Sequence, residues 1–261
     1  MGLPSNKLPV LEEFVSVQGE GINIGHPYYF IRVGGCPLRC SFCDSEYSWN
    51  ASQNQIVDLE LVIGRALDAC QKYGIKWVSV TGGEPMLYTK QLLTMIEQFN
   101  ANGLLVHIET SGRFYDKVVH ERSDLYSPDA KTPCTGEQMK GYFKGIENMR
   151  TQDQVKCLIS SNEDLDYAHA VNVQLNGACT MVLQPFNTNI VTNSTINMSD
   201  TMAGNRITQH LDAPTIRNNL SASLHWLLES YKLRCKMGEV WKRTIITPQI
   251  HVLAYGNRPG T

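Results

Sequence analysis

The sequence lacks an excess of positive charge. Its 23 lysine and arginine residues are offset by 25 aspartate and glutamate residues, which leaves a formal net charge of -2. Proteins that grip nucleic acid through its phosphates usually carry a basic face, so this balance argues against a nucleic-acid partner. Hydrophobic residues make up 42% of the chain and charged residues only 18%, a composition that supports a packed core and disfavours intrinsic disorder.

Long apolar runs are also missing. No stretch approaches the roughly 18 consecutive apolar residues that a membrane-spanning helix requires. Residues 1–10 have neither the charged head nor the apolar run of a secretory signal peptide. We therefore expect a cytoplasmic protein with no membrane partner, and a length of 261 residues suits one domain that covers residues 1–261.

A disulfide framework is not expected either, although the chain has eight cysteines. A chain of this length does not need such cross-links, and a reducing compartment would not keep them. Most of the cysteines are scattered, but three of them crowd into one short segment, as Cys36, Cys40 and Cys43. This uneven distribution is the first indication of a metal centre.

The middle of the chain alternates short β-type runs with amphipathic stretches. Strands are predicted over residues 28–33, 76–81, 104–110, 155–159 and 180–184. Apolar residues at helical spacing predict helices near residues 59–70, 92–99 and 216–231, and Asp58 is placed to cap the start of the first. Ser161 and Asp164 form a variant capping box that opens another helix. This alternation predicts an α/β fold, a partial TIM-like barrel of about six mostly parallel strands with crossover helices.

Residues 186–212 break the alternation. This segment is rich in Asn, Thr and Ser and has few apolar anchors, so we expect a loop or insertion there. The chain shows no internal repeat and no coiled-coil heptad, so a second domain is not needed. The functional loops of a parallel sheet should follow the carboxyl ends of its strands.

The three clustered cysteines follow the first predicted strand with the spacing C-x3-C-x2-C. Thiolates this close in sequence can all face one metal centre. A structural zinc site usually takes four ligands in two separated pairs, and no second C-x2-C pair appears downstream. Three cysteines on a [4Fe–4S] cluster leave one iron open to chelate the methionine moiety of S-adenosylmethionine. We therefore expect such a cluster on Cys36, Cys40 and Cys43. The alternative is three buried or zinc-binding cysteines that cluster by chance.

The cysteine loop resembles the signature of the radical S-adenosylmethionine superfamily. A second mark of that superfamily is the turn Thr81-Gly82-Gly83-Glu84-Pro85, directly after the next predicted strand. On its own this turn would also suit an ordinary strand-to-helix connection. The resemblance implies a radical S-adenosylmethionine core in which Gly83 lies beside the adenosylmethionine and Glu84 accepts from its methionine ammonium group.

Further motifs resemble one family, the 7-carboxy-7-deazaguanine synthases. The matching segments are residues 18–21 (Q-G-E-G), 25–27 (G-H-P), 30–32 (F-I-R), 43–45 (C-D-S), 109–112 (E-T-S-G), 127–136, 183–185 (L-Q-P) and 248–251 (P-Q-I-H). The resemblance covers most of the chain, except residues 186–212 and the last few.

This resemblance implies a specific reaction. The substrate would be 6-carboxy-5,6,7,8-tetrahydropterin, from which the radical removes the hydrogen at C6; the ring then contracts and ammonia leaves. The product would be 7-carboxy-7-deazaguanine, a precursor of queuosine and archaeosine. The resemblance also implies that adenosylmethionine is regenerated, that Mg²⁺ assists, that a donor such as flavodoxin or ferredoxin supplies electrons, and that the chain forms a homodimer.

The resemblance also assigns roles to individual residues. Substrate contacts are expected at Val17, Gln18, Gly19, Arg32 and Thr81. Cofactor contacts are expected at Gly83, Glu84, Asp129, Ala130, Lys131, Gln184, Pro185, Phe186 and Asn187. Arg32 offers a charge-assisted fork to the substrate carboxylate, although it could instead be a structural arginine. Glu109 is a catalytic candidate that either holds the ribose hydroxyls or helps a proton transfer.

The remaining assignments concern Mg²⁺ and the chain's end. Ser45 would bind Mg²⁺ through its hydroxyl, aided by substrate oxygens and Asp44, since magnesium needs few protein ligands. Ser45 stands where the family has threonine. Gln249 and His251 either cap the pocket or lie exposed to solvent.

Two other functions remain open at this point. The chain could be an activase that makes a glycyl radical on a partner protein, because such activases share the cysteine spacing and part of the N-terminal motif. It could also be a non-catalytic iron–sulfur or zinc module. Arg32 and the Q-G-E-G motif argue against the first alternative, and the T-G-G-E-P turn argues against the second.

Overall fold

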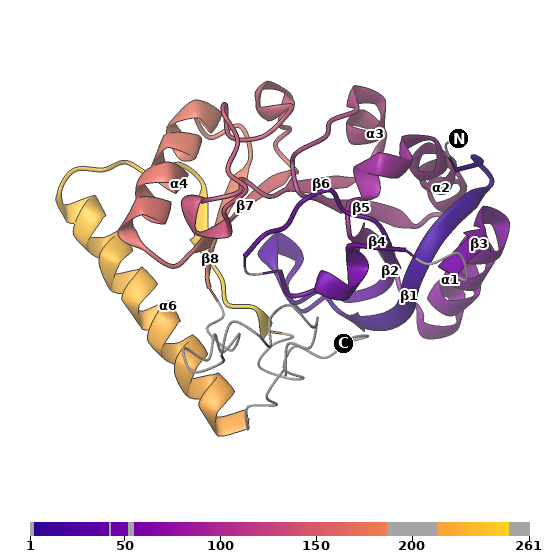
Figure 1. Ribbon diagram of the computed structural model, residues 1–261, viewed down its shortest axis with the longest axis horizontal. Coiled ribbons are helices and arrows are strands. Elements are labelled where there is room, and N and C mark those ends of the chain that lie inside the picture. The colour runs from indigo at the N-terminus through magenta and orange to yellow at the C-terminus, as the bar shows by residue number, and fades with distance from the viewer. Residues whose placement is uncertain (1–2, 42, 52–54, 187–212, 251–261) are drawn as a thin grey trace, which may run out of the picture.

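The computed structural model describes residues 3–41, 43–51, 55–186 and 213–250 (Figure 1). The strands are β1 (Lys7–Val17), β2 (Pro27–Val33), β3 (Ile56–Asp58), β4 (Trp77–Gly82), β5 (Leu105–Thr110), β6 (Leu125–Pro128), β7 (Gln154–Ile159), β8 (Thr180–Pro185) and β9 (Thr244–Ile246). The α-helices are α1 (Leu59–Tyr73), α2 (Thr89–Ala101), α3 (Lys117–Arg122), α4 (Asn162–Leu175) and α6 (Ala213–Lys236). None of the described helices has the length and apolar character needed to cross a membrane.

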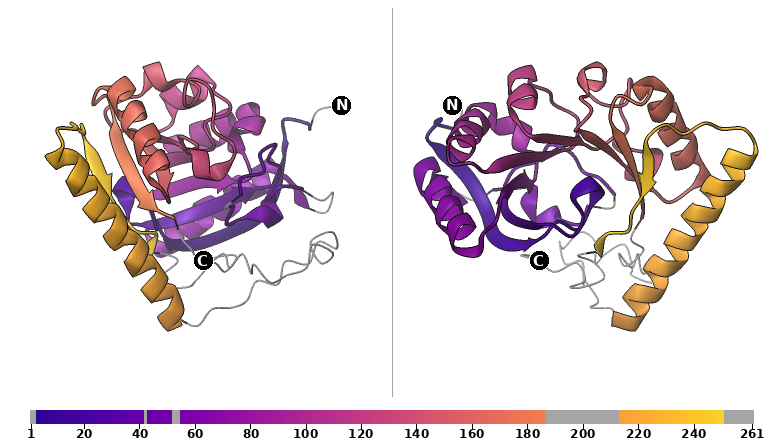
Figure 2. Two further views of the ribbon diagram at one scale, coloured as in Figure 1. Left: turned by 60° about the vertical axis from the view of Figure 1, so that its left-hand side comes forward. Right: turned by 180° about the vertical axis from the view of Figure 1, so that it is seen from behind.

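The strands form two sheets. The first has six strands in the order β3-β1-β2-β4-β5-β6, and the second has three in the order β7-β8-β9. Strands β2, β4, β5 and β6 run parallel to one another, and so do β7, β8 and β9. Figures 1 and 2 show the sheets as one curved wall with α1 to α4 on its outer side. The predicted partial barrel with crossover helices is therefore confirmed.

The sequence explains why these elements pack as they do. The central parallel strands bury one face completely, as Val78, Val80, Val106 and Ile108 illustrate, while alternate residues such as Thr81 and Glu109 line the cavity on the other face. Helix α1 turns the predicted stripe of Leu59, Val62, Ile63, Ala66 and Cys70 toward the core. A full capping box of Ser161 and Asp164 opens α4, as predicted.

One predicted helix cap differs in the structure. Asp58 occupies the N-cap position of α1, but its side chain accepts no capping hydrogen bond. Its carboxylate instead pairs with Lys7 at 2.8 Å, because β1 and β3 run antiparallel and place the two residues opposite each other. The carboxylate therefore ties the edge strand β3 to β1 and does not cap α1.

No predicted strand range covered β1, β3, β6 or β9. Strand β1 is antiparallel to both of its neighbours and carries a register shift between Val10 and Glu12. Its half-buried residues, which include Glu12 and Glu13, give no clean alternation of apolar and polar positions. The predicted insertion at 186–212 lies outside the described residues except for Phe186.

Candidate active site

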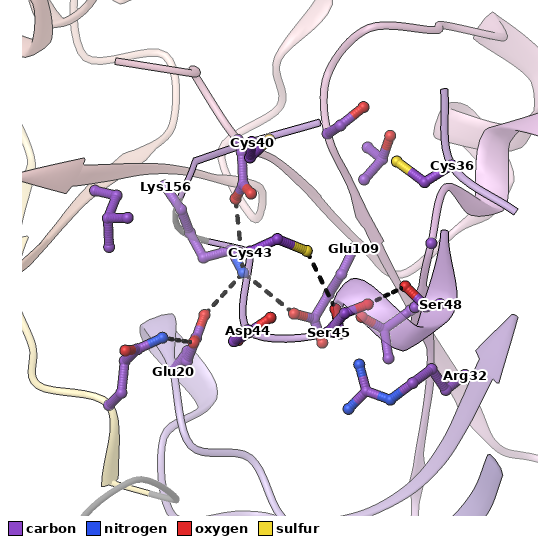
Figure 3. A pocket seen from close by; sticks show the side chains of 18 of the residues that line it. Glu20, Arg32, Cys36, Cys40, Cys43, Asp44, Ser45, Ser48, Glu109 and Lys156 are labelled. Carbon is purple, nitrogen blue, oxygen red and sulfur yellow. Dashed lines mark hydrogen bonds and ion pairs between the residues drawn. The ribbon is translucent and has the colours of Figure 1, made fainter. Parts of the chain in front are cut away.

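A cavity of about 250 Å³ opens where the parallel strands end. The ends of β4, β5 and β8, the interior of β7 and the segment after β6 all contribute side chains to it, and so does the cysteine loop after β2 (Figure 3). Ligands of parallel α/β sheets bind at this edge because the connecting loops converge there. This cavity is therefore the candidate active site.

The cysteine loop forms one wall of the cavity. Cys36, Cys40 and Cys43 all line it as free, partly buried thiols. Backbone hydrogen bonds hold the loop in place, from Gly35 N to Ser48 O at 2.8 Å and from Cys36 N to Trp49 O at 3.1 Å. The loop is thus fixed on the helical turn that follows it in sequence.

The chemistry of the three thiols fits an iron–sulfur cluster. Burial raises the pKa of Cys36, Cys40 and Cys43 above the usual thiol value, so a nearby cationic centre is needed to keep them as thiolates. Within the described ranges no three His, Cys, Asp or Glu side chains converge closely enough for a single metal ion. A cubane is several atoms wide and takes ligands that stand further apart.

The glycine turn after β4 packs against the start of the cysteine loop. Gly83 N donates to Val33 O and Glu84 N donates to Gly35 O, both at 2.8 Å. A Cβ atom at Gly83 would lie 2.2 Å from the Gly35 carbonyl oxygen. Glycine is therefore required here because two backbones pass each other with no room for a side chain.

Glu84 has a different environment from the expected one. Its side chain is fully buried and is not among the residues that line the cavity. The carboxylate accepts from Met86 N at 2.9 Å, from Thr110 Oγ1 at 2.6 Å, and from both the backbone nitrogen and the hydroxyl of Ser111. The side chain thus braces the end of β5. A contact between Glu84 and an adenosylmethionine ammonium stays a prediction.

Arg32 lies on β2 and lines the cavity. Its Nε donates to Glu12 at 3.0 Å, and its guanidinium carbon lies 6.0 Å from the ring centroids of both Phe14 and Tyr47. These contacts fix the plane of the guanidinium, which points into the cavity beside Asp44 (Figure 3). Arg32 therefore has both a structural partner, Glu12, and a side that faces the cavity.

Gln18 and Glu109 meet inside the cavity. Gln18 Nε2 donates to Glu109 Oε1 at 3.2 Å, and Ser79 Oγ donates to the same oxygen at 2.7 Å. Burial raises the pKa of Glu109, but Lys156, His107 and these donors outweigh it and lower the pKa to about 2. Glu109 is therefore an anion at neutral pH, which favours a role as hydrogen-bond acceptor over one as proton donor.

Sequence reasoning gave no role to Lys156 and Glu20, which also line the cavity. Lys156 Nζ lies 2.9 Å from a Glu20 oxygen, 3.2 Å from a Glu109 oxygen and 3.7 Å from an Asp129 oxygen. The available signal was a lysine inside the otherwise apolar run V-K-C-L-I of β7. A buried ammonium group needs charged or polar partners, so a lysine at this position indicates a functional or ion-pairing role.

Most of the expected site residues come together in this one cavity. Those that line it are Val17, Gln18, Gly19, Arg32, Cys36, Cys40, Cys43, Ser45, Thr81, Gly83, Glu109, Asp129, Ala130, Lys131, Gln184 and Phe186. Pro185, like Glu84, is not among the lining residues; it pairs with Ile159 at the end of β8. Asn187 and His251 lie outside the described residues. Gln249 lines the cavity and donates to Glu20.

Known proteins resemble this chain in sequence. Residues 17–131 match the family model of the 4Fe-4S single cluster domain. The 7-carboxy-7-deazaguanine synthase of Methanospirillum hungatei is 33% identical over 168 residues, which span 64% of this chain and 68% of that protein. The synthase of Pyrobaculum aerophilum is 34% identical over 162 residues, or 61% of this chain and 70% of that protein. The synthase of Flavobacterium psychrophilum is 42% identical over 107 residues, which span 41% of this chain but only 48% of that protein.

Solved structures also resemble the chain. The structure of QueE from Escherichia coli superposes with a TM-score of 0.54 and 25% identity, covering 69% of this chain and 84% of the other. That of Streptococcus suis SuiB shares the fold, with a TM-score of 0.50 and 13% identity over 88% of this chain and 50% of the other. The partial barrel and its cysteine loop define a radical S-adenosylmethionine enzyme, which implies an iron–sulfur cluster and adenosylmethionine. Within that class, the chain belongs to the 7-carboxy-7-deazaguanine synthase family. These matches favour neither the glycyl-radical activase nor the non-catalytic module.

Proposed function

We propose that this chain converts 6-carboxy-5,6,7,8-tetrahydropterin to 7-carboxy-7-deazaguanine with loss of ammonia. One observation carries the proposal: a single cavity holds the three-cysteine wall together with Arg32, Gln18 and Glu109. The cysteines supply a cluster site, and the other three side chains supply the charge and hydrogen-bonding groups that a carboxylated pterin needs.

Cys36, Cys40 and Cys43 would hold a [4Fe–4S] cluster. When bound, the cluster and S-adenosylmethionine supply a 5′-deoxyadenosyl radical. The segment of Asp129, Ala130 and Lys131 follows β6 and lines the same cavity as the cysteine loop, so it would bind the adenosylmethionine together with Gly83, Gln184 and Phe186. Lys131 donates to Asp129 at 2.7 Å, which holds that carboxylate in place.

The substrate would bind between β1 and β5. Arg32 would pair with the substrate carboxylate, since its guanidinium is already oriented by Glu12 and two aromatic rings. Gln18 Nε2 is directed to Glu109 and His107, while its Oε1 accepts from Glu20 N at 3.2 Å. The amide therefore has a fixed orientation, with its remaining acceptor capacity on Oε1. Glu109 would accept hydrogen bonds from substrate N–H groups as a fixed anion.

Mg²⁺ would bind beside Ser45. The Ser45 hydroxyl and the Asp44 carboxylate both line the cavity near Arg32, and Ser48 fixes the Ser45 backbone with a hydrogen bond to its carbonyl oxygen at 2.7 Å. Magnesium accepts one or two protein oxygens and completes its shell with water and substrate oxygens. A substrate carboxylate near Arg32 would supply such oxygens.

The remaining parts of this proposal rest on the family resemblance. A reducing donor such as flavodoxin or ferredoxin would deliver electrons to the cluster, and two copies of the chain would form a homodimer in the cytoplasm. Neither partner needs to enter the cavity, which suits a reaction on a free small molecule.

An anaerobic assay tests the proposed function. Reconstituted protein is mixed with dithionite, adenosylmethionine, Mg²⁺ and 6-carboxytetrahydropterin, and the products are followed by mass spectrometry. Formation of 7-carboxy-7-deazaguanine supports the proposal. If 5′-deoxyadenosine forms without that product, the radical chemistry stands and the substrate is wrong. If neither forms on an intact cluster, the catalytic proposal as a whole is wrong.

A further inference from the structure

Lys156 lies where the two sheets meet. Its backbone forms an isolated parallel bridge with Asp129, and its carbonyl oxygen accepts from Ala130 N at 2.9 Å. Within the described part of the chain, this is the one backbone bridge recorded between the six-stranded and the three-stranded sheet. The position of Lys156 therefore depends on how the two halves of the partial barrel are joined.

The side chain of Lys156 extends from this junction of the two sheets into the cavity. Figure 3 shows its ammonium group between carboxylates that come from three separate parts of the fold. Glu20 follows β1, Glu109 lies in β5, and Asp129 follows β6. Because Lys156 is buried, its ammonium group needs these carboxylates, and they need it.

The carboxylates belong to different sides of the cavity. The Glu109 carboxylate accepts from Gln18 Nε2 at 3.2 Å, and the backbone nitrogen of Glu20 donates to Gln18 Oε1, also at 3.2 Å, so both residues lie on the proposed pterin side. Asp129 begins the segment that we assign to adenosylmethionine. One ammonium group thus contacts the surroundings of both ligands.

We propose that Lys156 is a positioning residue that fixes Glu20 and Glu109 relative to Asp129 and so holds the substrate and the adenosylmethionine at the separation that hydrogen transfer needs. The inference rests on the proposed function and adds a residue to it. Reacting atoms must approach to about 3–3.5 Å, and a displacement of about 1 Å can cost a hundredfold in rate. An ammonium group held by both sides is suited to set such a distance.

The two sides should not depend on Lys156 equally. Asp129 also has Lys131, whose Nζ lies 2.7 Å from its other oxygen. Asp129 therefore keeps a cationic partner when Lys156 is replaced. The main effect of a substitution should fall on Glu20, Glu109 and Gln18, and hence on the pterin rather than on adenosylmethionine.

The test compares Lys156→Met and Lys156→Arg in the reconstituted holoprotein. For Lys156→Met we expect the KM for the pterin to rise at least tenfold and the ratio of released 5′-deoxyadenosine to product to rise at least tenfold. The Kd for adenosylmethionine should stay within about threefold. Lys156→Arg should recover part of the coupling because it keeps the charge.

Arg150→Met provides the matched control. Arg150 pairs with buried Asp153, just before the amino end of the same strand, at 2.7 Å. Its loss should lower the Tm without changing the product ratio. If Lys156→Met lowers the Tm but leaves KM and the ratio unchanged, or if Arg150→Met changes the ratio equally, Lys156 is merely structural and the proposal is wrong. Should Lys156→Met fail to fold, the double variant Lys156→Met/Glu20→Gln removes one carboxylate with the cation and is measured in its place.

A second readout needs neither cluster nor substrate. Selective ¹³C labelling of glutamate side chains lets the Glu109 carboxyl group be titrated by NMR in the apoprotein. Its pKa should rise clearly in Lys156→Met and stay low in Arg150→Met. An unchanged titration overturns the role of Lys156 whether or not the wild-type protein accepts a pterin. A raised pKa together with a wild type that forms no product leaves the positioning role intact and refutes the proposed substrate alone.

Discussion

His107 holds the side chain of Gln18 in place, with Nδ1 of the imidazole 3.4 Å from the amide nitrogen of Gln18. The amide donates, so Nδ1 must be unprotonated and the ring neutral. Burial is the main cause that lowers the pKa of His107, to about 4, and the positive charge of Lys156 adds to it although Glu109 opposes both. The orientation of a proposed substrate ligand thus depends on a neutral histidine that the sequence motifs do not include.

This neutral histidine should make the fold sensitive to acid. Between about pH 6.5 and pH 4 the unfolded chain binds a proton at position 107 that the folded chain does not, so stability rises with pH in this window and is lost as the pH falls. Because of this one proton, the free energy of unfolding should be about 3 kcal/mol higher at neutral pH than below pH 4. Urea unfolding at pH 4.5 and pH 7 should therefore show a smaller pH dependence for His107→Phe than for wild type.

The control for this experiment is His225→Gln. His225 is exposed on α6 and contacts neither Gln18 nor Glu109. It should keep the pH dependence of wild type. An identical pH dependence in His107→Phe and wild type would mean that His107 is charged in the folded protein and does not hold Gln18 in the way described.

Arg32 should be needed for the pterin and not for radical formation. Replacement by Met removes a charge-assisted pair worth about 1.5–3 kcal/mol, so kcat/KM for the pterin should fall roughly 10- to 100-fold. Adenosylmethionine cleavage without substrate should be retained, because Arg32 lies on β2 and contacts Glu12 and two aromatic rings, away from the segment that we assign to adenosylmethionine. Steady-state kinetics on Arg32→Met measure both quantities.

Arg65→Met is the matched arginine control. Arg65 lies on α1, is half-exposed and pairs with Glu13 on the outer side of β1. It should leave kcat/KM within about twofold of wild type. Equal losses in the two variants would show that Arg32 acts on the fold of β1 and β2 rather than on a ligand.

Much of the fold could be predicted because its signals are local. The central strands are short runs of β-branched residues that end in polar motifs, and Ser161 with Asp164 marks the start of α4 within four residues of sequence. Strand β1 was missed because Glu12 and Glu13 are among a run of half-buried residues, so the strand has no clear alternation of apolar and polar positions.

The site was predicted where motifs place ligand atoms and missed where distant residues meet. The cysteine spacing is a local signal, and the structure puts all three thiols on one wall. Lys156 and Glu20 are 136 residues apart, so no local pattern links them. Glu84 is the reverse case. Its motif predicts a contact with a ligand, but in the structure its carboxylate accepts hydrogen bonds from Thr110 and Ser111. Only the packing of β4 beside β5 reveals this.

Gly83→Ala should weaken the cluster site. The new Cβ would lie 2.2 Å from Gly35 O and 3.0 Å from Ser48 O, so the backbone before Cys36 has to move. We expect a lower Tm, and iron and sulfide contents after reconstitution that fall below half of wild type. Gly64→Ala is the control, because nothing lies within 4 Å of a Cβ there and a helical alanine should add about 0.5–1 kcal/mol of stability. Full cluster occupancy in Gly83→Ala would contradict the close-packing argument.

Asp153 should be important for stability and unimportant for the cavity. Its fully buried carboxylate accepts from Arg150 at 2.7 and 2.9 Å and lies 2.8 Å from His120 Nε2, and these partners overcome the effect of burial to lower its pKa to about 2. The folded chain therefore releases this proton more readily than the unfolded chain, so the stabilisation by Asp153 is present above about pH 4 and is lost as the pH falls toward 2.

Replacement of Asp153 tests this role. Asp153→Asn leaves Arg150 without its partner and should lower the free energy of unfolding, measured with urea at pH 7, by about 3–5 kcal/mol. Cluster content at a temperature where the variant is folded should match wild type. Asp68→Asn, on the exposed face of α1, should change neither quantity, and a stable Asp153→Asn would show that Arg150 finds another acceptor.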